Sequence, residues 1–129
     1  MVVCNEFAPG YSRNEQDWIE FGRDDKRRRE LFHPDSMKHM AKANINMVEA
    51  VYRYVSKPDD VIMDIMAGTG TLMLAATEGR QVLLIELQPD FQDIIALNID
   101  KLRQIKLPDN GGALPPQTPP IWFNNHAAR

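Results

Sequence analysis

The chain has 129 residues, of which 43% are hydrophobic, and its formal net charge at pH 7 is −3. This length is about one domain and suits a single hydrophobic core. The net charge argues against a generally basic protein that coats nucleic acid. The single cysteine, Cys4, excludes an internal disulfide and a cysteine-based zinc cage, and we predict no metal site.

No part of the sequence has the character of a membrane or export segment. Apolar stretches such as residues 82–85 are far shorter than the roughly 20 residues that a membrane-spanning helix needs. Residues 1–6 lack the basic and then apolar layout of a signal peptide. We therefore expect a cytoplasmic protein.

Positive charge is concentrated in the N-terminal third of the chain. The window from Arg23 to Lys42 has seven basic and four acidic residues and so carries +3, whereas the rest of the chain carries −6. Contacts with phosphate groups are therefore expected from this window, with Arg27, Arg28 and Arg29 as the candidates. A solvated charged face or a mobile arm is the alternative explanation of this basic run.

The first half of the chain is expected to contain an irregular arm and then one helix. Residues 1–37 are interpreted as the arm, because turn-forming residues open it and no clear apolar period follows. From about Met40 to Val55, apolar residues recur at the three-to-four spacing of one buried helical face. Pro58 cannot continue that helix and restricts the residue before it.

The pattern of residues 61–105 is typical of a parallel βαβ unit, which makes the fold class α/β. Two short apolar runs, residues 61–66 and 81–86, are predicted to be buried strands. A short helix over residues 72–78 is predicted between them and is closed by Gly79, and a long helix begins at Pro89. Residues 38–106 thus form one expected unit, and the Pro- and Gly-rich residues 107–129 an irregular tail.

Two features of the βαβ unit predict a nucleoside-containing ligand. Glycines in the loop of residues 67–71 let a ligand approach the backbone where a Cβ would collide. Glu86 ends the next strand, where a carboxylate can accept hydrogen bonds from ribose hydroxyls. A tight turn without a ligand is the alternative for the loop. An NAD site would require a third glycine where Met73 stands.

Three segments together resemble motifs of the S-adenosylmethionine-dependent DNA amino-methyltransferases, particularly those of phages. They are Lys38-His39-Met40-Ala41-Lys42-Ala43-Asn44, the loop from Asp64 to Thr71, and Ile85-Glu86-Leu87-Gln88-Pro89-Asp90-Phe91. The resemblance implies a partial Rossmann-like class I methyltransferase fold, S-adenosylmethionine as cofactor and double-stranded DNA as partner. It also implies methyl transfer to the exocyclic amino group of adenine or cytosine.

The resemblance assigns the cofactor to residues of all three motifs. Asp64, Ala67, Gly68 and Gly70 would hold the methionine moiety, Glu86 the ribose and Leu87 one face of the adenine. Lys42 and Asn44 would reach the methionine carboxylate, or are ordinary exposed polar residues. The loop residues Met66, Thr69 and Thr71 complete the predicted cofactor site.

The catalytic residues are not identified by the sequence. The family uses an Asp/Asn/Ser-Pro-Pro-Tyr/Phe loop, whereas Leu114-Pro115-Pro116-Gln117 and Thr118-Pro119-Pro120-Ile121 have no aromatic residue directly after the prolines. We therefore expect the chain alone to be inactive. A non-catalytic nucleoside-binding module or a partner subunit is the alternative function, and exposed strand edges predict self-association.

Overall fold

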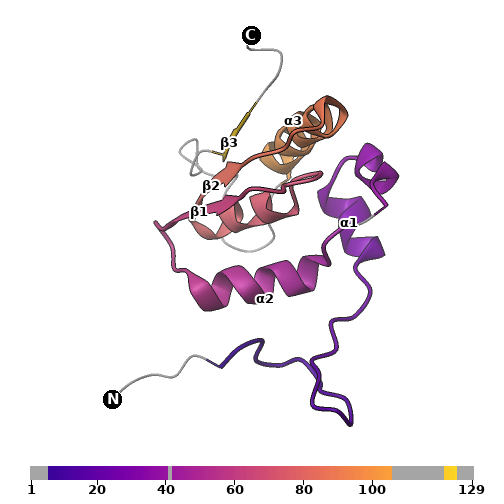
Figure 1. Ribbon diagram of the computed structural model, residues 1–129, viewed down its shortest axis with the longest axis vertical. Helices are drawn as coiled ribbons and strands as arrows, with labels where there is room; N and C mark the ends of the chain where they lie inside the picture. The colour runs from indigo at the N-terminus through magenta and orange to yellow at the C-terminus, as the bar shows by residue number, and fades with distance from the viewer. Residues whose placement is uncertain (1–5, 41, 106–120, 125–129) are drawn as a thin grey trace.

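The computed structural model describes residues 6–40, 42–105 and 121–124, which form helices and a small parallel sheet (Figure 1). In chain order the elements are α1 (Asp25–Leu31), η1 (Pro34–Lys38), α2 (Ile45–Val55), β1 (Val61–Asp64), η2 (Thr71–Glu78), β2 (Gln81–Leu84), α3 (Pro89–Gln104) and β3 (Ile121–Phe123). η1 and η2 are 3-10 helices. Within the described ranges, no helix is long and apolar enough to cross a membrane.

The three strands form one sheet in the order β1-β2-β3, and both pairs of neighbours are parallel. The prediction of an α/β fold with β1 and β2 in parallel is thereby confirmed. The sequence analysis missed the third strand. It follows a proline-rich stretch and has only three residues, which is too short to show the alternation typical of a strand. Trp122 lies opposite Leu83 in the register that joins β3 to β2.

Among the described residues, those of η2 and α3 cover one face of the sheet. Val82 and Leu84 are buried on that face against residues of η2 and α3, in a core that also includes Met73 and Ile95. η2 lies between the sheet and α2 (Figure 1). On the opposite face Val61 is 64% exposed, and Met63 of the same strand and Trp122 of β3 are also exposed.

Helix α2 begins later than the sequence indicates. The predicted start at Met40 is wrong, because Asn44 caps the helix with its side-chain oxygen, which accepts hydrogen bonds from the backbone N–H groups of Asn46 and Met47. An asparagine in this role satisfies N–H groups that have no partner within the helix. The segment before Asn44 is thereby left outside the helix.

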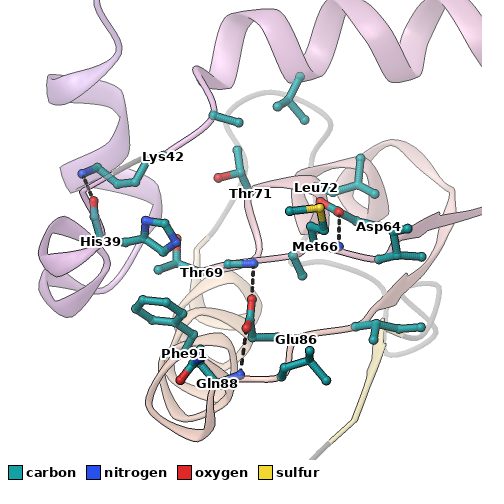
Figure 2. A pocket seen from close by; sticks show the side chains of 17 residues that line it. His39, Lys42, Asp64, Met66, Thr69, Thr71, Leu72, Glu86, Gln88 and Phe91 are labelled. Atoms are coloured by element: carbon teal, nitrogen blue, oxygen red, sulfur yellow. Dashed lines mark hydrogen bonds between the residues drawn. The ribbon is translucent and has the colours of Figure 1, made fainter.

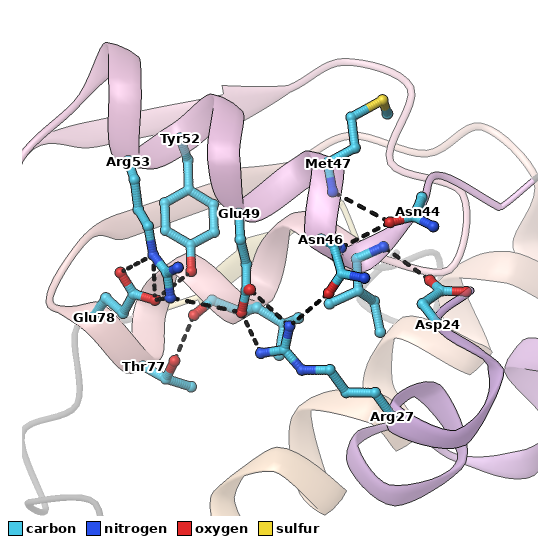
Figure 3. A network of polar contacts seen from close by, with 12 residues as sticks. Asp24, Arg27, Asn44, Asn46, Met47, Glu49, Tyr52, Arg53, Thr77 and Glu78 are labelled. Atoms are coloured by element: carbon cyan, nitrogen blue, oxygen red, sulfur yellow. Dashed lines mark hydrogen bonds and ion pairs between the residues drawn. The ribbon is translucent and has the colours of Figure 1, made fainter. Parts of the chain in front are cut away.

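The expected irregular arm contains α1 and η1, which the sequence analysis missed. α1 is only seven residues long, too short to be stable by helix propensity alone. Two of its arginines contact residues distant in the chain: Arg27 forms an ion pair with Glu49 of α2 (Figure 3), and Arg28 donates a hydrogen bond to the Ala43 carbonyl. These tertiary contacts, absent from any local pattern, hold the basic run in a helix.

A second polar cluster joins α2 to the end of η2 (Figure 3). Glu78 accepts hydrogen bonds from the Tyr52 hydroxyl at 2.7 Å and from Arg53 Nε at 3.0 Å. Burial alone would raise the pKa of Glu78, but the hydrogen bonds from Arg53 and Tyr52 outweigh it and lower that pKa below its usual value. Glu78 is therefore held as a carboxylate. Directly after it, Gly79 ends η2 at φ +86°, which confirms the predicted cap.

Candidate functional site

A cavity of about 470 Å³ lies at the carboxyl ends of β1 and β2 (Figure 2). In parallel α/β sheets this edge is where ligands bind, and the volume falls within the range of small-molecule sites. Most of the wall comes from three parts of the chain: the segment before α2, the glycine loop after β1, and the segment after β2. These are the three segments in which the sequence analysis found its motifs.

Glu86 is fixed in this cavity by the backbone on both sides of it. Its Oε2 accepts a hydrogen bond from the Gly68 N–H at 2.8 Å, and its Oε1 accepts one from the Gln88 N–H at 2.8 Å. An ionised carboxylate has about four acceptor positions, so these two bonds leave further positions open to a ligand. The side chain is thus oriented before any ligand arrives.

Asn124 holds the Glu86 backbone from the end of β3. Its side-chain oxygen accepts from the Glu86 N–H at 2.8 Å, and its amide donates to the Glu86 carbonyl at 2.7 Å. The sequence analysis missed this contact, because it depends on a strand that could not be predicted. The carboxylate at the pocket is therefore supported from both β2 and β3.

On its cavity side, the glycine loop lies close to the segment before α2. Asp64 Oδ1 accepts from the Met66 N–H at 2.9 Å and so ties the end of β1 to the loop. A Cβ added at Gly68 would stand 3.2 Å from Nε2 of His39. A residue with a Cβ would also be strained there, because φ is +57°. The loop backbone is thus approached by a side chain from the segment before α2, and glycine keeps that approach open.

His39 and Phe91 form one end of the cavity. Their rings are stacked with centroids 4.4 Å apart and planes 28° apart (Figure 2). Both residues stood within the quoted motifs, but neither was predicted as part of the site. The other lining residues that were missed are Ala43, Val48, Ile65, Leu72, Ile85 and Gln88.

The structure brings most predicted cofactor residues together. Those that line the cavity are Lys42, Asp64, Met66, Ala67, Gly68, Thr69, Thr71, Glu86 and Leu87. Leu87 is 83% exposed and offers an apolar surface at the rim. The Lys42 ammonium donates to the His39 carbonyl at 2.5 Å, so it is turned back onto its own segment.

Two predicted residues do not line the cavity. Asn44 is occupied as the cap of α2, and its amide donates to the Gly22 carbonyl at 2.9 Å. Gly70 lies at φ +87° and faces the core, where an added Cβ would stand 2.6 Å from Met73 Cε. Both serve to shape the backbone around the cavity.

The basic run is divided between surface and interior. Arg29 is exposed, Arg27 is partly buried in its ion pair with Glu49, and Arg28 is buried. A phosphate contact by Arg28 is inconsistent with this burial. Of the three arginines predicted to contact DNA, Arg29 is therefore the one whose side chain is accessible.

The cavity combines a fixed carboxylate with an exposed apolar rim and a loop whose backbone can be approached closely. These features together suit a nucleoside with a polar tail. Among the described residues no group of three or more side chains is arranged to hold a metal ion.

Comparison with protein families matches residues 10–97 to the DNA methylase family. Searches of curated proteins and of solved structures gave no match. The matched range contains all three motifs and all of the residues that line the cavity. The chain therefore belongs to the DNA methylase family, as its resemblance to the DNA amino-methyltransferases indicated.

Proposed function

We propose that this chain binds S-adenosylmethionine in the cavity and serves methyl transfer to the exocyclic amino group of adenine or cytosine in DNA. The observation that carries the proposal is the Glu86 carboxylate, held by the Gly68 and Gln88 N–H groups at the carboxyl end of a parallel strand. Its remaining acceptor positions suit the two ribose hydroxyls of the cofactor. The DNA methylase family supports both the cofactor and the DNA substrate.

The rest of the cofactor is assigned along the cavity. The adenine would lie against Leu87 at the rim, and the methionine moiety would lie along the loop between Asp64 and Gly68. Thr69, Thr71 and Lys42 also line the cavity. In this arrangement the protein binds and orients the cofactor, which supplies the reactive methyl group.

Methyl transfer also requires a base that has been turned out of the duplex and held in line with the methyl group. The residues that line the cavity contain no Pro-Pro-aromatic loop for this purpose. The prolines of residues 114–120 lie outside the described ranges. We therefore retain the proposal that this chain is inactive by itself, with its catalytic residues unknown.

The uncovered face of the sheet supports a second proposal, that the chain acts as a non-catalytic module or partner subunit. Parallel sheets are almost always covered on both faces, whereas Val61, Met63 and Trp122 are exposed here. β1 is an edge strand of the described sheet and is available for pairing. Self-association or docking of a partner would cover this surface.

One set of measurements tests the proposed function. S-adenosylmethionine should raise the thermal midpoint of the chain, because it binds the native state, and NAD should leave the midpoint unchanged. A radiolabelled methyl group should not be transferred from S-adenosylmethionine to mixed-sequence DNA above the Asp64→Ala blank. Stabilisation by NAD alone would refute the cofactor assignment, and label above the blank would show that the chain is a complete catalyst.

The DNA contact is tested separately at Arg29, which is exposed on α1. Arg29→Ala should weaken DNA binding and reduce the slope of log affinity against log salt by about 0.9, the value for one phosphate contact. Lys57→Ala, which removes an exposed cation from the turn before β1, is the matched control and should leave the slope unchanged. Equal slopes for Arg29→Ala and the unaltered chain would make the basic run a solvated face.

A further inference from the structure

Arg28 belongs to the basic run, yet its side chain is only 2% exposed. Its guanidinium donates three hydrogen bonds: to Asp24 Oδ2 at 2.8 Å, to the Ala43 carbonyl at 2.5 Å and to Thr71 Oγ1 at 3.2 Å. A buried arginine is costly unless its charge is paired and its donors are used. Here the charge is paired with Asp24, and the remaining donors reach two other segments.

Those two segments are separate parts of the cavity wall. Ala43 belongs to the segment before α2, and Thr71 ends the glycine loop, and both line the cavity. Asp24 extends the connection, because its Oδ2 also accepts from the Ile45 N–H at 2.8 Å. One ion pair in α1 and its cap thus joins the start of α2 to the loop that follows β1.

The contact also constrains the Thr71 hydroxyl. Arginine can only donate, so the Thr71 oxygen accepts from Arg28 and the hydroxyl hydrogen must point to another acceptor. Thr71 is buried from solvent, with 6% exposure, and it lines the cavity. A ligand oxygen in the cavity is therefore a suitable acceptor for this hydrogen.

We propose that Arg28 is a positioning residue of the cofactor pocket, which sets the separation of Ala43 from Thr71 and orients the Thr71 hydroxyl as a donor toward the ligand. The inference rests on the proposed function in that S-adenosylmethionine is the ligand. It assigns to the basic run a role in cofactor binding that is independent of DNA.

The test compares Arg28→Met with Arg80→Met. Arg80 is also buried, and it donates to the Ser56 carbonyl at 3.0 Å and to the Glu78 carbonyl at 3.0 Å, outside the cavity. Both variants lose a buried, hydrogen-bonded arginine and should lower the thermal midpoint. Only Arg28→Met should also weaken S-adenosylmethionine binding, by roughly tenfold in calorimetry well below the midpoint.

Thr71→Val serves as the second variant, because it keeps the side-chain shape and removes only the hydroxyl. It should weaken S-adenosylmethionine binding severalfold, and its effect should not add fully to that of Arg28→Met, since both remove the same contact. Equal cofactor affinity of Arg28→Met and Arg80→Met would overturn the proposal. Should Arg28→Met not fold, unchanged affinity of Thr71→Val would overturn it instead. Failure of the unaltered chain to bind S-adenosylmethionine would refute the proposed function itself, and with it this role of Arg28.

Discussion

Glu86→Ala should weaken S-adenosylmethionine binding by roughly 1.5 to 3 kcal/mol, the usual range for loss of hydrogen bonds to a charged acceptor. The carboxylate is expected to accept from the ribose hydroxyls. It also holds the Gly68 and Gln88 N–H groups at 2.8 Å, so its removal frees the loop that the cofactor must contact. Calorimetric titration at a temperature where the variant is folded measures the effect.

Asp90→Ala is the matched control for Glu86→Ala. Asp90 is an exposed acid in the first turn of α3, four residues along the chain, and it does not line the cavity. Its removal should leave cofactor affinity within the error of the measurement. Unchanged affinity in Glu86→Ala itself would remove this carboxylate from the site and with it the main support for the proposed cofactor.

Gly70→Ala should lower the free energy of unfolding by roughly 3 kcal/mol, through two separate costs. An added Cβ would stand 2.6 Å from Met73 Cε, 3.2 Å from Leu84 Cδ1 and 3.3 Å from Ile95 Cγ1, which is overpacking of a kind that typically costs 1 to 3 kcal/mol. The left-handed conformation at φ +87° adds about 1 kcal/mol for any residue with a Cβ. Urea-induced unfolding measures the sum.

Gly10→Ala separates the two costs. Gly10 has the same φ of +87°, but an added Cβ there would meet no atom within 4 Å. This variant should lose only about 1 kcal/mol, the conformational part. Equal losses at both positions would show that Met73 and its neighbours give way at no cost, and that Gly70 is required for its backbone conformation alone.

Local sequence signals were sufficient for the elements that carry the cofactor motifs. The apolar runs predicted β1 and β2, although both strands end two residues earlier than expected and β1 has no buried residue. Gly79 predicted the end of η2, and Pro89 predicted the start of α3. Each signal depends on a property of the residue itself or of its near neighbours, such as the φ of proline or the absence of a Cβ. For the same reason the sequence predicts that the glycine loop and Glu86 belong to one ligand site.

The βαβ unit, its parallel sheet and the family of the chain therefore follow from local patterns of residues. The roles of residues whose partners are distant in the chain become visible only when the fold brings those partners together. Arg28 resembles a surface cation until Ala43 and Thr71 are placed beside it, and β3 becomes a strand only through its pairing with β2. Such contacts produce no periodic pattern in the sequence, because hydrogen bonds and ion pairs between distant elements depend on where those elements meet in the fold.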